Sequence, residues 1–511
     1  MTVAVAVSSC TKNFDTINTN PNTSAAAYPQ QLLAPALVNT LTYNLNRNRN
    51  FNNELMQVTV NISDADGQVF RYDFTRSWAD YTYNGWYSQL TNFRDIYKLA
   101  SDTTNSATYN KSYMGISLIC QAWIFSMLTD TYGNVPFTQA LLARDSIIFE
   151  PKFDSQKDIY TGIFAMLDSA NTLLKAGTNI NAASDPVYNG SVANWRNFGN
   201  SLFLRLLLRV SGKTEMADYC KSKIKDIVDN RPDNYPIITS NAQSAILKWT
   251  GAGAYISPLY SIRPADYHAP SICDFFINHL VSWNDPRIDL GVYGITVGTS
   301  KYNAWGIAPF NGAFVGVPSG YSAGTGATQK SYFYGYSDAN SLVVSMQTEP
   351  KTGMMMNYAE TQFILAECAA KGWINTGTAE AYYDTAVTNS ITLWVPAWTT
   401  PVTTYLVNST GPGLNNTMRW DNNASLDTKM ELIHLQKYYA LMFTDMQQWF
   451  EYRRTGHPVL PKGPGLQNGG VMPARMTYPV YVQSTNPTNY KAAVAAQGPD
   501  EINTQTWWQK P

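Results

Sequence analysis

The sequence predicts a mainly α-helical protein with a smaller loop-rich region of mixed structure. Residues 428–455 place apolar side chains at alternating spacings of three and four, which lines one face of a helix. Residues 112–132 are apolar almost all round, which is typical of a buried helix. Ala379, Tyr383 and Ala386 have the spacing found in the second helix of a tetratricopeptide repeat. From residue 231 to about 351 helical periodicity is absent, and Gly, Pro, Ser and aromatic residues gather there.

The N-terminal residues predict a lipidated segment followed by a tether. Residues 1–10, MTVAVAVSSC, read as the end of a secretory signal and a lipobox, with Cys10 as the acylated residue. A short buried strand is the alternative, because no positive segment precedes the apolar run. Residues 11–30 are polar and Asn-rich, and we expect a flexible tether there.

The rest of the chain divides into four segments. Residues 31–230 form the first part of a helical scaffold, with helical patterns at 32–45, at 112–132, at 159–174 and at 194–211. We expect the Asn/Arg stretch 46–53 to break the first of these, and Gly133 with Pro136 to end the second. Residues 231–351 are a loop-rich insertion and the candidate ligand site. Residues 352–460 return to helices, and residues 461–511 form a loop-rich tail.

The stretch 428–461 has marked ends. Thr428 and Glu431 have the spacing of a capping box at its start. Arg453 and Arg454 fall in the last turn, where cations suit the helix dipole, and we expect them to pair with nearby acids. Gly456 and Pro458 are expected to stop the helix.

Composition excludes several classes of function and favours a sugar-binding one. The net charge is −1 with no basic run, which argues against a nucleic-acid partner. Charged residues are only 14% of the chain, whereas aromatic residues reach 13%. Sugars offer apolar C–H faces to stack on and neutral hydroxyls to hydrogen-bond, so amphipathic rings and neutral polar groups suit them. Secreted proteins in general often share this composition.

No cofactor or metal is expected. The five cysteines lie far apart without a C-x-x-C motif, and the four histidines give no zinc-binding spacing. The segment 64–67, DADG, lacks the further acids of an EF-type calcium loop and is more simply a turn. The longest strongly apolar run, 114–128, is too short to predict a transmembrane helix.

The sequence also argues against an enzyme. Residues 320–324 spell G-x-S-x-G, but glycine-rich sequence flanks them and no helix is predicted after the serine, as a nucleophile elbow requires. A secreted glycan hydrolase would need two opposed carboxylates, and acidic residues are sparse in the aromatic-rich insertion.

Several segments, in order along the chain, resemble the SusD/RagB family, and particularly its SusD-like branch. They are FDTINTNPN (14–22), TDTYGNVPFTQAL (129–141), NWRNFGNSLFLRLLLRVS (194–211), SWNDPRIDLGVYG (282–294), YAETQFILAE (358–367) and WFEYRRTGHPVL (449–460). PARMTYPV (473–480) is similar as well, but Ala474 and Val480 depart from the family pattern.

The resemblance implies a fold and a function. The fold would be a scaffold of tetratricopeptide-like helix pairs whose loops carry the ligand site. The protein would be a lipid-anchored lipoprotein on the surface of the outer membrane that binds an oligosaccharide and delivers it to a SusC-like TonB-dependent transporter. RagB-type relatives take up peptides, so a peptide ligand is the alternative.

We predict that the ligand site uses aromatic side chains from segments without helical periodicity. A ring that stacks on a sugar should be half exposed, with neutral neighbours such as Asn84, Asn303 or Asn311. Trp123, Trp195 and Trp449 lie on apolar helix faces and are assigned to packing. The candidate rings are Trp78, Tyr81, Trp249, Tyr255, Trp305 and Tyr321.

Overall fold

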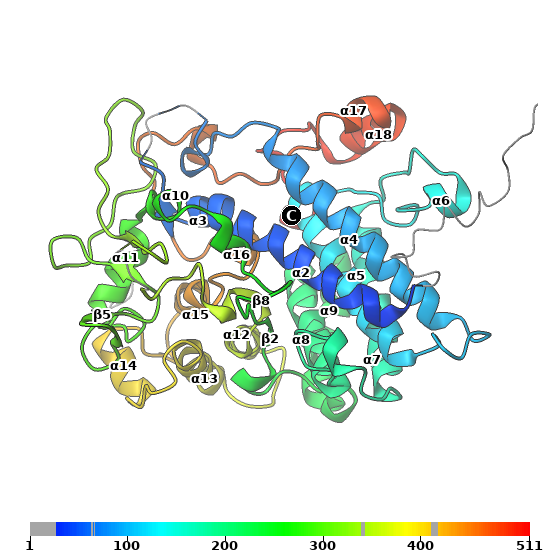
Figure 1. Ribbon diagram of the computed structural model, residues 1–511, viewed down its shortest axis with the longest axis horizontal. Coiled ribbons are helices and arrows are strands. Elements are labelled where there is room, and N and C mark those ends of the chain that lie inside the picture. Colours follow the sequence, from blue (N-terminus) through cyan, green and yellow to red (C-terminus); the bar gives the residue numbers. More distant parts are fainter. Residues whose placement is uncertain (1–26, 63–64, 66, 339–342, 410–416, 511) are drawn as a thin grey trace, which may run out of the picture.

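Long helices form the scaffold of the protein (Figure 1). The computed structural model describes residues 27–510 except 63–64, 66, 339–342 and 410–416. The longer helices are α2 (Pro29–Arg47), α4 (Trp78–Ser101), α5 (Lys111–Tyr132), α7 (Gln156–Lys175), α8 (Val192–Val210), α9 (Thr214–Lys225), α12 (Tyr358–Ala370), α13 (Ala379–Thr392), α15 (Leu426–Ala440), α16 (Gln447–Thr455) and α18 (Pro487–Gln497). The shorter ones are α3 (Asn53–Leu55), α6 (Ala143–Ser146), α10 (Pro264–His268), α11 (Asp274–Ser282), α14 (Val402–Asn408) and α17 (Val482–Thr485).

The helices pack as neighbouring pairs, which confirms the predicted tetratricopeptide-like scaffold. Helices α2, α4, α5, α7, α8 and α9 each contact the next in this order, and α12 packs on α13, on α15 and on α8. Small residues permit the close approaches: a Cβ on Gly115 of α5 would lie 2.7 Å from Leu174 Cγ of α7. The contact between α8 and α12 joins the two helical parts into one stack.

Helix α5 is the central buried helix. The Asn110 side chain caps it by accepting hydrogen bonds from the backbone N–H groups of Ser112 and Tyr113. It ends at Gly133, whose φ of 82° suits glycine, as predicted. By length and composition α5 could cross a membrane, but most of it is buried inside the protein. We therefore interpret α5 as a core helix.

The region predicted as one helix at 428–455 is two helices. Helix α15 ends at Ala440 and α16 begins at Gln447. The cap of α15 is Ser425, which accepts from Thr428 N–H, so the predicted capping box at Thr428 and Glu431 is wrong. The Glu431 carboxylate accepts instead from Val459 N–H at 3.1 Å. The predicted C-terminal end is confirmed, with Gly456 in the left-handed region at φ 76°.

The Asn/Arg stretch after α2 does not break the helix, contrary to expectation. Residues Asn48–Asn52 continue it as a π-helical turn that leads directly into α3. Two buried amides hold this turn in place. Asn48 Nδ2 donates to the main-chain oxygen of Asp445 at 2.8 Å, and Asn52 Nδ2 donates to Gln448 Oε1 at 2.6 Å. These tertiary hydrogen bonds outweigh the low helix propensity of asparagine.

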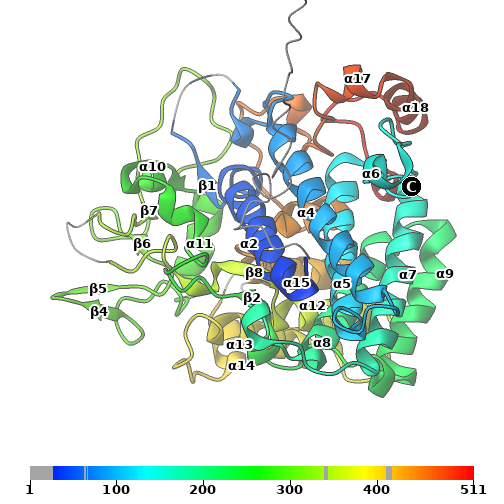
Figure 2. The same cartoon turned by 45° about the vertical axis from the view of Figure 1, so that its right-hand side comes forward.

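Short antiparallel pairs make up the sheet structure of the described residues. They are β1 (Thr59–Val60) with β3 (Ser271–Ile272), β2 (Ala245–Leu247) with β8 (Gly353–Met356), β4 (Ile295–Val297) with β5 (Ser300–Tyr302), and β6 (Ile307–Ala308) with β7 (Tyr332–Phe333). Because β2 pairs with β8, the chain leaves the scaffold after Leu247 and returns at Gly353. Strands β4 to β7 with α10 and α11 lie together beside the helical stack (Figure 2).

Ion pairs buried between helices hold the stack together. Arg205 of α8 pairs with Glu360 of α12, with 2.6 Å between Nε and Oε1. Arg209 reaches Asp130 of α5 at 3.3 Å and Glu451 of α16 at 3.0 Å. These arginines therefore act in packing between helices. Trp123, Trp195 and Trp449 are also buried, which confirms their assignment to the core.

Candidate ligand-binding site

Two of the predicted ligand-stacking rings, Trp249 and Trp305, are core residues. Trp249 is 2% exposed and Trp305 is 0% exposed. The Trp305 indole stacks on Phe276 at a centroid distance of 5.7 Å, and the Arg287 guanidinium covers it at 4.7 Å. Asn303 is buried as well and closes the local turn to Ile307. Neither indole has a face open to a ligand, so their prediction as stacking rings is corrected.

Trp78 and Tyr81 lie together, but on a helix rather than in a loop. Both belong to the first turn of α4 and are half-buried. Arg47 covers both rings, at 4.6 Å from the Trp78 centroid and 4.8 Å from the Tyr81 centroid. Asn46 Nδ2 donates to the Tyr81 hydroxyl at 2.7 Å. The Arg47 guanidinium thus holds the rings of Trp78 and Tyr81 from one side, and each ring stays partly exposed.

Tyr321 is half-buried in a separate small cluster. Its ring lies 5.1 Å from Phe70 and 4.8 Å from the Arg71 guanidinium, and its hydroxyl donates to the main-chain oxygen of Asn61 at 3.0 Å. The next α-helix that the structure describes after Ser322 is α12, which begins at Tyr358, so the strand-turn-helix geometry of a nucleophile elbow is missing at this G-x-S-x-G sequence.

Tyr255 is the predicted ring that lines an open cavity. This cavity of about 370 Å³ lies between the loop before α8 and the end of β2. Asn189, Lys248 and Thr250 also line it. Ring and neutral polar groups therefore meet here, but the structure does not bring Tyr255 together with Trp78, Tyr81 or Tyr321 in one cavity.

A group of exposed and partly exposed tyrosines in the insertion was not among the predicted residues. Burial alternates along residues 332–336: Phe333 of β7 is buried, whereas Tyr332, Tyr334 and Tyr336 are partly exposed. Tyr260, which is 45% exposed, stacks on Tyr336 at 4.6 Å with an interplanar angle of 27°. We call this surface the tyrosine face, and it consists of Tyr260, Tyr332, Tyr334 and Tyr336.

Edge-to-face contacts fix the rings of the tyrosine face. Tyr334 lies 5.8 Å from Tyr332 and 5.3 Å from the buried Tyr302 behind it. His268 of α10 contacts Tyr332 at 5.2 Å, and its Nδ1 lies 2.8 Å from Asp338 Oδ1. The rings are thus held by neighbours while part of each remains exposed. The alternation of residues 332–336 is the sequence signal that could have found them.

The phenols of Tyr332 and Tyr334 are neutral near pH 7. Burial, and then the charge of Asp338, raise the pKa of Tyr332, and burial also raises the pKa of Tyr334. A neutral phenol both donates and accepts hydrogen bonds. The tyrosine face therefore combines apolar ring surface with neutral hydroxyls, the combination that a sugar needs.

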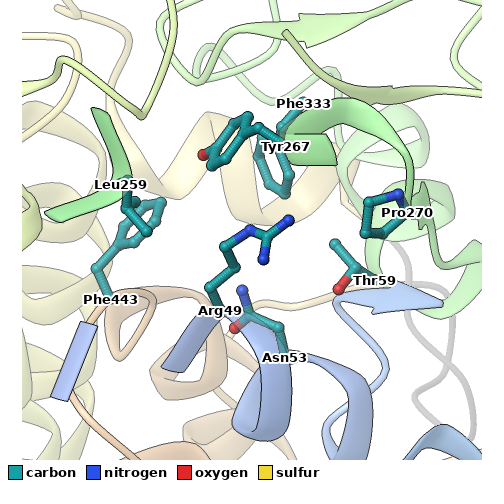
Figure 3. Close-up of a pocket in the computed structure, with 8 residues that line it drawn as sticks. All are labelled: Arg49, Asn53, Thr59, Leu259, Tyr267, Pro270, Phe333 and Phe443. Carbon is teal, nitrogen blue, oxygen red and sulfur yellow. The ribbon is translucent and has the colours of Figure 1, made fainter. Parts of the chain in front are cut away.

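A small cavity lined by Phe333 of β7 is too small to be a sugar site (Figure 3). Phe333, Tyr267, Asn53 and Arg49 line it, and the Arg49 guanidinium points toward the two rings in Figure 3. Its volume is about 20 Å³, which holds about one water molecule. A sugar does not fit.

One group of buried side chains has the composition of a metal site but is an ion-pair network. Ligand atoms of Glu367, His434 and Glu451 lie within 4.8 Å of one another. Lys437 Nζ is 2.6 Å from Glu451, and Arg454 Nη2 lies 2.7 Å from Glu367 and 2.8 Å from Glu451. These cations already compensate the carboxylates, so the charge that would attract a metal is absent.

The remaining sequence predictions fall in different places. Cys10, Asp64 and Asp66 lie outside the described residues. Asn84 and Asn311 are exposed. The cysteines that the structure describes carry buried free thiols: Cys120, Cys220, Cys273 and Cys368.

Known proteins share this sequence pattern and this fold. Residues 21–479 match a family of SusD-like proteins described as starch-binding and associating with the outer membrane. No curated protein matches the chain. A SusD homolog from Bacteroides uniformis is 23% identical and superposes with a TM-score of 0.75 over 95% of this chain and 100% of its own.

Two further solved structures have the same fold. A chitin-binding SusD homolog from Flavobacterium johnsoniae is 21% identical, with a TM-score of 0.75 over 94% of this chain and 98% of its own. A SusD homolog from Bacteroides fragilis is 23% identical, with a TM-score of 0.73 over 95% and 100%. At these identities the likeness shows the fold. Because the family match spans most of the sequence, the chain belongs to the SusD-like family, whose members are described as starch-binding proteins that associate with the outer membrane.

Proposed function

We propose that this protein captures an oligosaccharide at the surface of the outer membrane, with the tyrosine face as its main contact surface, and passes it to a SusC-like TonB-dependent transporter. The observation that carries the proposal is the group of exposed and partly exposed phenol rings in β7 and beside it. The family description and the chitin-binding relative support a glycan as the ligand class.

The geometry of the rings suits a chain of sugars better than a compact molecule. Tyr332 and Tyr334 lie 5.8 Å apart at steep mutual angles, and Tyr260 and Tyr336 form a stacked pair. Rings at different angles offer several separate faces, each of the size of one sugar unit. Successive sugar units could then stack on successive rings while the phenol hydroxyls bond their hydroxyls.

Trp78 and Tyr81 remain a proposed second contact, with Tyr255 and Tyr321 as further candidates. Arg47 holds the Trp78 and Tyr81 rings in place, which lowers the entropy cost of stacking a ligand on them.

The domain arrangement that we propose keeps the sequence boundaries. Residues 231–351 are the ligand-binding insertion between scaffold parts 31–230 and 352–460, residues 11–30 are the tether, and residues 461–511 are the tail. Stacked helix pairs present extended surfaces, so we propose that the helical face carries the transporter. Copurification from native membranes in mild detergent tests this: a complex with a β-barrel partner is expected, and recovery of the protein only as a monomer contradicts it.

A ligand panel tests the proposed function. The full-length protein is run through gels that contain starch, chitin derivatives or other polysaccharides, and is titrated with a protein digest. Retardation by a polysaccharide is expected. Binding of the digest without retardation by any polysaccharide would assign a peptide ligand and overturn the proposal.

A further inference from the structure

Helix α16 ends in two arginines with different surroundings. Arg454 pairs with Glu367 and Glu451. Arg453 forms no ion pair with a carboxylate of the described residues. Its Nη2 donates to the main-chain oxygen of Asp130 at 2.6 Å, and its Nη1 donates to the main-chain oxygen of Ala474. The charged guanidinium of Arg453 is thus hydrogen-bonded by neutral main-chain oxygens and not by a carboxylate.

The nearest carboxylate, that of Asp130, is already engaged. Its Oδ1 accepts from the Tyr160 hydroxyl at 2.6 Å and from Trp508 Nε1 at 2.9 Å. Its Oδ2 lies 3.3 Å from Arg209 Nη1. The Asp130 carboxylate therefore pairs with Arg209, and no carboxylate of the described residues pairs with Arg453.

Aromatic rings hold the guanidinium in a fixed position. Arg453 Cζ lies 4.0 Å from the Trp449 ring centroid and 4.8 Å from that of Trp508. Its buried Nε has no hydrogen-bond partner in the described part of the chain. A cation packed between indoles is preorganised, so an anion that meets it need not order the side chain first.

Arg453 lines an open cleft of about 440 Å³ between the end of α16 and the C-terminal segment. Lys510 lines it too, and its Nζ donates to the main-chain oxygen of Gln497 at 2.7 Å. Tyr452 and three residues with side-chain amides, Asn503, Gln505 and Gln509, also line it. No carboxylate is among the residues that line this cleft.

We infer that this cleft is a second ligand site, which binds the carboxylate of a small organic anion such as a hexuronic acid. Two cations and three amides supply donors, and a carboxylate would accept from an N–H group of the Arg453 guanidinium that the main-chain oxygens leave free. The volume lies within the range of roughly 300 to 1,000 Å³ that small-molecule sites occupy. A sugar acid would also find neutral hydrogen-bond partners in the amides for its hydroxyls.

Electrostatics agree with this assignment. Burial, with a smaller contribution from nearby Arg209, lowers the pKa of Arg453 to about 9, although Asp130 opposes the shift. The group is still charged near pH 7, but its charge is poorly compensated. A bound carboxylate would supply the missing counter-charge.

The site stands apart from the proposed glycan-binding function. Its residues belong to α16 and to the C-terminal segment, whereas the tyrosine face belongs to the insertion. Failure of glycan binding on the tyrosine face would therefore leave this inference untouched, and the converse also holds.

Titration of the full-length protein with sodium glucuronate at constant ionic strength tests the inference, with glucose and sodium sulfate as comparison probes. Binding of glucuronate is expected, with no binding of glucose and weaker binding of sulfate. Equal binding of glucose and glucuronate would overturn the anion assignment. Sulfate that binds as tightly as glucuronate would overturn the carboxylate assignment.

Variants at the rim avoid the risk that Arg453 variants fail to fold. Gln505 is exposed, so Gln505→Glu keeps the shape of the cleft but adds a negative charge. We expect it to weaken glucuronate binding by about fivefold or more, because like charges a few ångströms apart repel. Asn39→Asp on the exposed side of α2 is the matched control and should change nothing. Equal affinity of Gln505→Glu and wild type would place the anion elsewhere and overturn the inference.

Discussion

Arg454 of α16 and Glu367 of α12 form a bidentate ion pair. The distances are 2.8 Å between Nη1 and Oε1 and 2.7 Å between Nη2 and Oε2. Burial would raise the pKa of Glu367, but Arg454 and then Lys371 outweigh it and hold this pKa well below its usual range. The pair thus joins the end of the second scaffold part to its beginning.

Removing one partner of this pair should destabilise the protein strongly. In Glu367→Gln, Arg454 would lose one of its two carboxylates in a buried site, at a cost of about 3 to 5 kcal/mol. Denaturant unfolding measures the loss. Asp145→Ala, at the exposed pair with Lys98, is the control and should leave the midpoint unchanged. A similar midpoint for both variants would show that the network adds little to stability.

Glu54 should make stability fall as pH rises. Burial raises the pKa of this carboxyl from 4.5 to about 7, although a hydrogen bond from the Phe70 backbone opposes the shift. The folded state therefore holds the proton more tightly than the unfolded chain, and this contribution is complete below about pH 4.5 and is lost as pH rises through about 7. The free energy of unfolding falls by about 3 kcal/mol over this pH range.

Glu54→Gln isolates this effect. The difference in unfolding free energy between wild type and Glu54→Gln should shift by that amount between pH 4.5 and pH 8, in favour of the variant at high pH. Glu501→Gln at an exposed position is the control. A difference that does not change with pH would show that Glu54 is not protonated in the folded protein.

Trp305→Ala should lower stability and leave ligand binding intact. The indole is fully buried against Phe276 and Arg287, so truncation leaves a cavity and costs about 3 to 5 kcal/mol. Thermal melts and titration with a bound polysaccharide separate the two effects. Loss of polysaccharide binding at an unchanged melting temperature would show that Trp305 belongs to the ligand site and not to the core.

Cys10 should carry the lipid anchor. When the chain is expressed with a complete signal peptide in a suitable host, wild type should take up labelled fatty acid and Cys10→Ala should not. Two acyl chains anchor a protein stably where one gives only marginal binding, so the variant should also leave the membrane fraction. Equal labelling of the two proteins would rule out acylation at this residue.

Local signals predicted the helix ends only where a single residue decides them. Gly456 and Gly133 were predicted because glycine suits the left-handed or extended turns that end helices. The start of α15 was not, because Ser425 and Thr428 both have a capping side chain and the local pattern does not choose between them. The π-turn at residues 48–52 depends on Asp445 and Gln448, nearly four hundred residues away.

The candidate site was predicted only in part, because it also depends on contacts between residues that are far apart in the sequence. Trp305 has the flanking residues of a loop, but Phe276 and Tyr439 from distant helices cover it, and no local pattern reports such partners. Trp78 and Tyr81 are half-exposed as expected, though they begin a helix. The tyrosine face follows from alternation along a short strand, which gives the side of each ring but not its exposure.

Titration of a polysaccharide fragment into wild type and into Tyr334→Ala tests the central claim most directly. Tyr334 lies between Tyr302 and Tyr332 on the tyrosine face. On the scale of about 1 to 3 kcal/mol for one stacked ring in nucleic-acid sites, the variant should bind about tenfold more weakly or worse, at an unchanged melting temperature. Tyr109→Ala, at an exposed tyrosine outside the face, is the control and should bind like wild type. Wild-type affinity in Tyr334→Ala would contradict the account and place the oligosaccharide on another surface.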